Sequence, residues 1–340
     1  MARGSAGAEQ SMSRERCQVE LPTKIVVGVD ISESLIPVFN EASTLGRLLG
    51  AELALAHAID EVSPASTAFD VLAEQAYETF SGLRLRAQFH GVVLDPIDYV
   101  RAGTPESVLC EVAQDTAADW IMVGAGNRTP LERLLGDPTA ESVLCDSPLP
   151  VWVVRPSAPL DKLTRIVCAV DGSEPARCAT LTAAAFAQRI GAGLTLLAIG
   201  PHAKTGPVTR RLARSLIQTG TTKGKRPAFE VLTVKGDPQS EILRHLDLSE
   251  ADLLVLGCAG RKGLRRVWRR NTVERLARRV PCSVLSVPSL ARRPRPLFAR
   301  AGVAGLHSQT HLHQSPAHTP PRRAPSSGPL VGSWPNAKGV

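Results

Sequence analysis

Short apolar runs bounded by turn residues alternate along the chain with stretches whose apolar residues recur at helical spacing. Runs of this length, rich in Val, Ile, Leu and Ala, are typical of buried strands, and the stretches between them predict amphipathic helices. The expected strands of the first half span 24–30, 52–59, 92–101, 119–123 and 150–154.

The helix after the second strand is expected to bury one face. Its apolar residues recur three or four positions apart, which places them on one side of a helix. They are Phe69, Leu72, Ala76, Tyr77, Phe80 and Leu83.

The second half repeats the first. Its expected strands span 165–171, 193–199, 228–234, 252–256 and 282–287. Asp30 matches Asp171 at an offset of 141 residues, whereas Asp119 matches Asp252 at an offset of 133, so the second copy is 8 residues shorter between its second and third strands. Strands that alternate with helices over short connections predict an α/β fold with two tandem, doubly wound, parallel five-stranded sheets.

Composition places the charge outside this repeat. The formal net charge is +8, but residues 291–340 contain seven Arg and Lys and no Asp or Glu, so the body is nearly neutral. Apolar periodicity is missing from both ends of the chain, which predicts disorder there. We expect a disordered segment over 1–20, a first domain over 21–157, a second over 161–289 and a disordered Pro/Arg/His-rich tail over 290–340.

Several classes of protein are disfavoured. No apolar run reaches the roughly 18 residues of a membrane span, and residues 1–20 lack a signal-peptide core, so we expect a cytoplasmic protein that does not bind membranes. Seven cysteines without a C-x-x-C pair argue for reduced thiols and against a structural metal site. His57 stands alone on an apolar run, which favours a satisfied core histidine over a ligand.

Glycine-rich loops follow the fourth strand of both copies. Gly257 begins G-C-A-G in the second copy, and Gly124 begins G-A-G-N in the first. Together with V-D at Val29-Asp30 and V-D-G-S at Val170–Ser173, these loops make the chain resemble a tandem universal stress protein over about residues 24–289. The resemblance implies an adenine nucleotide alpha hydrolase-like, Rossmann-like fold. It also implies binding of ATP or a related nucleotide through G-x-x-G, nine residues and G-[S/T], with the first-strand aspartate beside the adenine.

Both copies depart from that motif. The second has Arg270-Asn271 where Gly-Ser is expected, and the first has Asn127 in place of the second glycine and Gly136-Asp137 at the end. Asn271 can still donate a hydrogen bond and the neighbouring arginines favour phosphate, whereas Asp137 would repel phosphate unless a divalent cation such as Mg²⁺ lies between them. The second copy is therefore the better candidate. The candidate contacts are Asp171, Gly257, Gly260, Arg261, Arg270, Asn271 and Thr272 in the second copy, and Asp30, Gly124, Gly126 and Gly136 in the first.

Four functions stay open on the sequence alone. The leading hypothesis is a regulatory, stress-response binding module that holds an adenine nucleotide in the second copy. The second is a nucleotide-free scaffold of the same fold that acts through protein partners. An enzyme is disfavoured because G-x-S-x-G, H-E-x-x-H and Walker A motifs are missing, and a specific nucleic-acid reader because no aromatics interleave with the tail arginines. Because family dimers commonly join through their fifth strands, we also expect the two copies to pair there as an intramolecular pseudo-dimer.

Overall fold

The computed structural model describes residues 21–32, 35–125, 143–144, 147–155, 163–199, 228–258 and 279–289. Both terminal segments predicted to be disordered, and most of the two glycine-rich loops, lie outside the described residues.

Strands and helices alternate in both halves. The first half contains β1 (Lys24–Gly28), α2 (Leu35–Leu49), β2 (Glu52–Ile59), α3 (Thr67–His90), β3 (Tyr99–Ala102), α4 (Pro105–Asp115), β4 (Trp120–Gly124) and β5 (Val151–Val154). The second contains β6 (Arg165–Val170), α7 (Glu174–Ile190), β7 (Gly193–Ile199), β8 (Phe229–Val234), α9 (Pro238–Ser249), β9 (Leu253–Cys258) and β10 (Ser283–Pro288).

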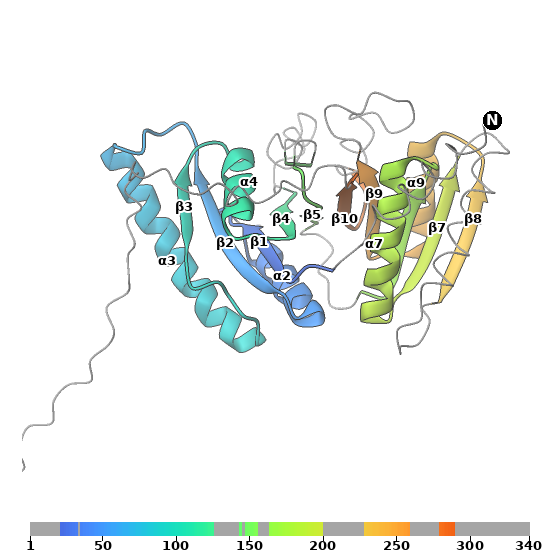
Figure 1. Ribbon diagram of the computed structural model, residues 1–340, viewed down its shortest axis with the longest axis horizontal. Helices are drawn as coiled ribbons and strands as arrows, with labels where there is room; N and C mark the ends of the chain where they lie inside the picture. The colour runs from blue at the N-terminus through green and yellow to red at the C-terminus, as the bar shows by residue number, and fades with distance from the viewer. Residues whose placement is uncertain are drawn as a thin grey trace, which may run out of the picture. The chain divides into compact units, whose positions relative to one another are not determined.

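The two halves have the same strand order. The first half runs β3-β2-β1-β4-β5 and the second β8-β7-β6-β9-β10, and all neighbouring strands within a half are parallel. Figure 1 shows the strands of each half side by side, with helices packed against them. The prediction of two doubly wound parallel sheets is confirmed.

Strands β5 and β10 join the two sheets by an antiparallel pairing in which Trp152 lies opposite Leu285. The flanking partners are Val153 with Val284 and Val151 with Ser286. Trp152 and Leu285 are also equivalent positions of the repeat, so the register has the symmetry of a two-fold axis at this pair. The expectation that the fifth strands join is met, and neither apolar strand is left as an open edge.

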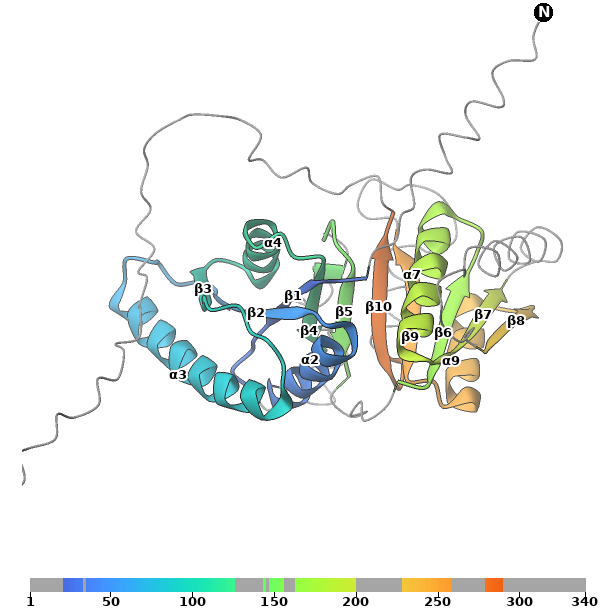
Figure 2. The ribbon, with the colours of Figure 1, turned by 60° about the horizontal axis from the view of Figure 1, so that its bottom comes forward.

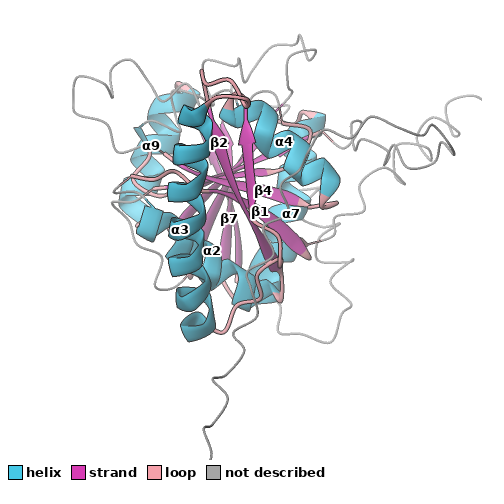
Figure 3. Cartoon of the chain, turned by 90° about the vertical axis from the view of Figure 1, so that its left-hand side faces the viewer, coloured by secondary structure: helices cyan, strands magenta, loops and turns pink. Residues whose placement is uncertain are grey.

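Helices cover both faces of the sheets. One core cluster gathers residues of α2, α3 and α7, and the other gathers residues of α4 and α9. In the first half, Figure 3 shows α2 and α3 on one side of the strands and α4 on the other, and Figure 2 shows α3 beside α2. Alternating residues of each buried strand therefore enter different clusters, as Val26 and Val27 of β1 do.

Polar residues set the helix ends. Ser66, Thr104, Ser173 and Asp237 each accept a backbone N–H of the first turn, so they are the N-caps of α3, α4, α7 and α9. Gly91 and Gly191 adopt left-handed backbone geometry just past α3 and α7, which glycine does at no steric cost.

Three predicted elements need correction. The expected strand over 92–101 is only β3, because Pro96 cannot donate to a ladder and the Asp95 carboxylate accepts the N–H of Ile97 in a tight turn. Leu72, predicted to be buried, is 37% exposed, because α3 turns Ala73 and Ala76 to the core instead. Strand β9 continues through Gly257 and Cys258, which were expected to be loop.

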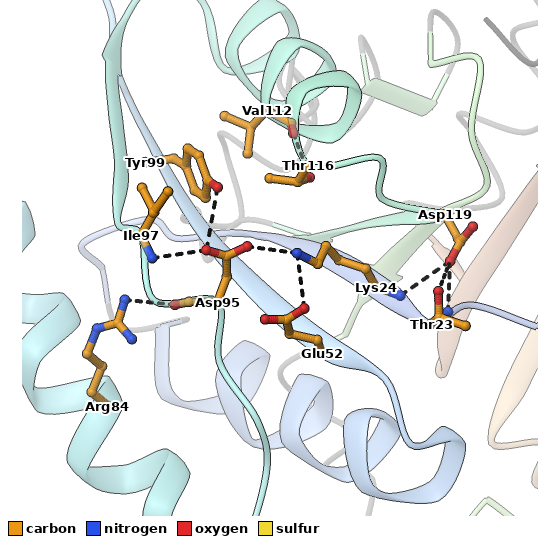
Figure 4. Close-up of polar contacts among 10 residues, drawn as sticks. All are labelled: Thr23, Lys24, Glu52, Arg84, Asp95, Ile97, Tyr99, Val112, Thr116 and Asp119. Atoms are coloured by element: carbon orange, nitrogen blue, oxygen red, sulfur yellow. Dashed lines mark hydrogen bonds and ion pairs between the residues drawn. The ribbon is translucent and has the colours of Figure 1, made fainter. Parts of the chain in front are cut away.

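The amino ends of the first-half strands carry a polar cluster (Figure 4). Asp119 accepts the N–H of Thr23 at 2.7 Å and its hydroxyl at 2.9 Å. Nearby, Lys24 contacts Asp95 at 2.8 Å and Glu52 at 3.0 Å. Burial alone would lower the pKa of Lys24, but these two carboxylates raise it above its ordinary value. The cluster stabilises the sheet edge opposite the candidate nucleotide loops.

Candidate functional site

The candidate residues that the structure describes, Asp30, Gly124, Asp171 and Gly257, sit at the carboxyl ends of the central strands. In the second half, the chain leaves β6 toward β7 on one side, while β9 lies on the other side of β6. In the first half, β1 lies between β2 and β4 in the same way. Such a reversal of strand order leaves a crevice at the carboxyl edge of an open parallel sheet, where α/β proteins of this kind bind ligands.

Asp171 follows β6 and shapes the turn into α7. Its Oδ1 accepts the N–H of Ser173 at 2.9 Å, and Ser173 Oγ in turn accepts the N–H of Ala176 at 3.3 Å. Gly172 between them has φ +82°, a backbone conformation that glycine adopts without strain. This contact uses one carboxylate oxygen of the half-buried Asp171, and an ionised carboxylate can accept further hydrogen bonds.

Gly257 brings the end of β9 against the first turn of α7. A Cβ at this position would overlap the carbonyl carbon of Pro175 and the amide nitrogen of Ala176. The sequence suggested that this glycine serves ligand access, but close packing of helix on strand already requires it. The same contact puts the start of the second glycine-rich loop beside the turn that holds Asp171.

The first half places the described equivalents, Asp30 and Gly124, at the same edge of its sheet. Asp30 is exposed and its carbonyl accepts the N–H of Ser32, while Gly124 ends β4. His57 Nδ1 lies 2.7 Å from the carbonyl oxygen of Val29, which supports the interpretation of a satisfied histidine.

The remaining candidate residues lie outside the described residues. They are Gly260, Arg261, Arg270, Asn271 and Thr272 in the second copy, and Gly126 and Gly136 in the first. Of the candidate residues in the second copy, the structure describes Asp171 and Gly257, and it places them close together.

Sequence reasoning missed a buried carboxyl group where the halves join. Glu41 of α2 is 3% exposed, its Oε1 accepts Trp152 Nε1–H at 2.6 Å, and its carboxyl also hydrogen-bonds Ser283 of β10. Burial raises the pKa of Glu41 to about 7, although both hydrogen bonds oppose that shift. The sequence did contain an indication of this buried acid, because Glu41 lies between Val38 and Ala42 in the apolar stripe of its helix.

The aromatic side chains around this carboxyl group come from both halves. Trp152 stacks on Trp120 with ring centroids 6.1 Å apart, and Phe186 of α7 packs edge-on to both tryptophans. Such contacts add to the burial energy of large rings. The join between β5 and β10 is therefore part of a continuous core.

The cysteines of the described residues are free thiols. Burial raises the pKa of Cys168 and of Cys282 to about 12, so both are poor nucleophiles. Cys258, at the end of β9, lies with its Sγ 3.8 Å from the carbonyl oxygen of Leu144. Within the described ranges, no three His, Cys, Asp or Glu side chains cluster as metal ligands would. None of the described helices combines the length and apolar character needed to cross a bilayer.

A profile of the universal stress protein family matches the chain twice, over residues 22–155 and 162–288. The chain belongs to this family. The two matches account for the repeat, and the Rossmann-like fold of the family agrees with the parallel sheets described above.

Solved structures carry the same fold. A universal stress protein from Archaeoglobus fulgidus DSM 4304 superposes with a TM-score of 0.68 at 18% identity, over 78% of this chain and 98% of that one. A functionally unknown protein from Pseudomonas aeruginosa PAO1 gives 0.53 at 17% identity, over 79% and 93%. A putative universal stress protein from Pseudomonas aeruginosa UCBPP-PA14 gives 0.52 at 17% identity, over 78% and 93%. No curated protein sequence matches the chain.

Proposed function

We propose that this universal stress protein is a regulatory module that binds ATP or a related adenine nucleotide in its second domain, without catalysing a reaction. The observation that carries the proposal is the contact of Gly257 with the first turn of α7. That contact sets Gly257, the first residue of the glycine-rich sequence, beside the turn of Asp171, at the carboxyl ends of adjacent strands. One crevice can then hold a base at the aspartate and phosphates at the loop.

The base end fits an adenine. The carboxylate of Asp171 is held by the N–H of Ser173, so it is fixed in orientation before a ligand arrives. A fixed acceptor suits the exocyclic amino group of adenine, which donates hydrogen bonds. The proposed contact is therefore a hydrogen bond from the base to the oxygen that Ser173 leaves available.

The residues proposed to face the phosphates are of types that bind phosphate. Gly260 has no side chain to block a ligand, Asn271 offers an amide donor, and Arg261 and Arg270 offer positive charge. In the first domain, Asp137 occupies the position of the hydroxyl residue. Its repulsion of a phosphate could reach roughly 4 kcal/mol at about 4 Å and an effective dielectric constant near 20, compared with about 1 kcal/mol for a lost hydrogen bond. The second domain is therefore the proposed site, and Mg²⁺ would be needed only beside Asp137.

Calorimetry with ATP on the full chain tests the proposal. Wild type should bind, and Asp171→Ala should weaken binding by about tenfold or more, in line with the loss of a hydrogen bond to a charged acceptor. Asp30→Ala is the matched control, because Asp30 is the equivalent residue of the first domain, and it should leave the affinity unchanged. Binding that is lost in Asp30→Ala but kept in Asp171→Ala would contradict the choice of domain.

A second function, a nucleotide-free scaffold that acts through protein partners, is favoured by one observation. Arg270 stands where the motif has a glycine, so a large side chain takes a position that the motif keeps bare. Arg270→Gly separates the two functions. If wild type does not bind ATP and the variant does, the chain is the scaffold; if wild type binds and the variant binds more weakly, Arg270 is a phosphate contact.

A further inference from the structure

Helix α3 has a buried apolar stripe and, on its opposite side, a row of exposed residues that is apolar in part. Its buried stripe consists of Ala73, Ala76, Phe80, Leu83 and Ala87. A second stripe, here named the outer seam, recurs at alternating spacings of four and three residues, as in a helix that packs along another helix. The outer seam consists of Val71, Gln75, Glu78, Gly82, Leu85 and Phe89, all of them exposed.

The carboxyl-terminal half of the outer seam is unusually apolar for a free surface. Phe89 is 94% exposed and Leu85 is 63% exposed, and Val93 just beyond the helix is 66% exposed. Scattered apolar side chains are normal on a surface, but a contiguous group of this kind marks an interaction site. A shallow hollow between these side chains is lined by Gly82, Leu85, Arg86, Phe89 and His90.

Gly82 opens this hollow. A Cβ at Gly82 would meet no atom within 4 Å, so its missing side chain is not explained by packing inside the chain. Glycine in the middle of a helix costs about 1 kcal/mol relative to alanine. A glycine on a helix face also lets a second helix approach closely, so the position suits a helix crossing.

The charges of α3 are separated along its length. Asp70, Glu74 and Glu78 lie in the first half of the helix, and Arg84, Arg86 and His90 lie in the second half. Arg84 is already engaged inside the chain, by Asp98 and the carbonyl oxygen of Asp95. Arg86, whose Nε donates to Asn40 Oδ1 of α2 at 3.4 Å, and His90 are the basic residues that border the hollow.

We propose that a second copy of this chain docks antiparallel against the outer seam, with the two Gly82 residues at the crossing point. In this arrangement seam positions equidistant from Gly82 meet. Glu78 of one copy lies near Arg86 of the other, and Phe89 covers Gln75. Each contact occurs twice, as the symmetry of an isologous dimer requires. A partner helix of uniform charge, or a parallel second copy, would place like charges together.

The dimer should be weak. A helix of this length is about 36 Å long and about 10 Å wide, which offers on the order of 400 Å² per copy. Standard interfaces use roughly 800 Å² per partner. We therefore expect a dissociation constant of tens to hundreds of micromolar, which is typical of a transient contact.

Sedimentation velocity of the full chain from about 5 to 500 µM tests this proposal over the range in which such a dimer dissociates. Wild type should shift from monomer to dimer, and Phe89→Asp should weaken association at least roughly tenfold. Gln88→Asp is the matched control, because Gln88 is the exposed neighbour of Phe89 off the outer seam, and it should associate like wild type. A wild type that stays monomeric throughout, or equal behaviour of the two variants, would overturn the proposal.

Charge exchange tests the antiparallel register. Glu78→Arg should weaken association by about tenfold, because it places like charges opposite each other twice. The double variant Glu78→Arg with Arg86→Glu should restore it to near the wild-type constant. Circular dichroism should show unchanged helix content in each variant, since the substituted side chains are exposed. A double variant that associates no better than Glu78→Arg would rule out this pairing.

Discussion

Glu41 in the first half and Thr182 in the second are equivalent positions of the repeat, and both are buried, at 3% and 4% exposure. Thr182 donates its hydroxyl to the carbonyl oxygen of Cys178 at 3.0 Å, within its own helix. The carboxyl group of Glu41 instead hydrogen-bonds side chains outside its helix, Trp152 of β5 and Ser283 of β10. Equivalent buried positions are thus occupied in one half by a hydroxyl that bonds within its own helix, and in the other by a carboxyl group that bonds to strands of both halves.

The symmetry of the join explains why only one half can use a glutamate. The positions that correspond to Trp152 and Ser283 are Leu285 and Pro150, and neither side chain can donate a hydrogen bond. A carboxyl group at position 182 would therefore lack both partners, and an unpaired buried acid is costly. The two copies of this repeat therefore differ at a position whose partners lie where the copies meet.

The largest effect should come from Gly257→Ala. Its Cβ would overlap backbone atoms of Pro175 and Ala176, which cannot rotate away, so we expect a loss of about 3 kcal/mol or more. Gly28→Ala is the comparison from the first half. There the Cβ meets Leu109 Cδ1 at 3.1 Å, a side-chain end that can shift, and we expect a loss of about 1 kcal/mol.

The second half supports that contrast, since Ala169 already stands at the position equivalent to Gly28 and is 1% exposed. Thermal unfolding measures both variants, at about 2–4 °C per kcal/mol for a protein of this size. Equal losses of stability in Gly257→Ala and Gly28→Ala would contradict this prediction. They would show that the first turn of α7 can move away from the added Cβ.

Glu41→Gln should remove a pH dependence of stability. The folded-state pKa of Glu41 is raised to about 7 from an ordinary 4.5. The stability that the protonated carboxyl group contributes to the folded state is therefore fully present below pH 4.5 and is lost as pH rises through 7. Glutamine keeps an acceptor for Trp152 and does not ionise. Relative to wild type, the variant should therefore gain roughly 3 kcal/mol between pH 5 and 8.

Urea unfolding at a series of pH values measures this difference. Glu74→Gln is the control, because Glu74 is exposed on α3, and its difference from wild type should stay flat. A flat curve for Glu41→Gln as well would mean that the carboxyl group is solvated in the folded protein.

The comparison also shows what the sequence could predict. Apolar runs and the two offsets predicted the strands and the doubly wound parallel sheets, because these follow from burial and short connections. The family resemblance predicted the pairing of the fifth strands and a site shared by Asp171 and Gly257, at the edge where the carboxyl ends of neighbouring parallel strands meet. The late start of β3 was missed, since it depends on the turn that Asp95 makes with Ile97.

Residues with a role across the join escaped prediction for a different reason. Glu41 looks like an interruption of an apolar stripe until Ser283 is placed beside it, and the two are far apart in sequence. Gly257 was assigned to a ligand because its sequence does not reveal the helix turn that contacts it. Long-range partners of single side chains are therefore what the structure adds.

The smallest effect concerns the amino ends of the sheets, where the halves agree. Asp252 accepts the N–H of Thr164 at 2.7 Å and its hydroxyl at 2.9 Å, the same distances that Asp119 shows to Thr23. Each aspartate also accepts the next N–H, of Lys24 at 3.3 Å or Arg165 at 2.9 Å.

Asp119→Ala and Asp252→Ala should therefore each cost about 1–2 kcal/mol, with the larger loss in the second half because its third bond is shorter. The two sites share no partner, so the double variant should lose the sum of the two within about 0.5 kcal/mol. Urea unfolding of the three variants measures this. A loss confined to one half would mean that the other closes its sheet edge by different contacts, and in the first half the pairs of Lys24 with Asp95 and Glu52 are the ones that could do so.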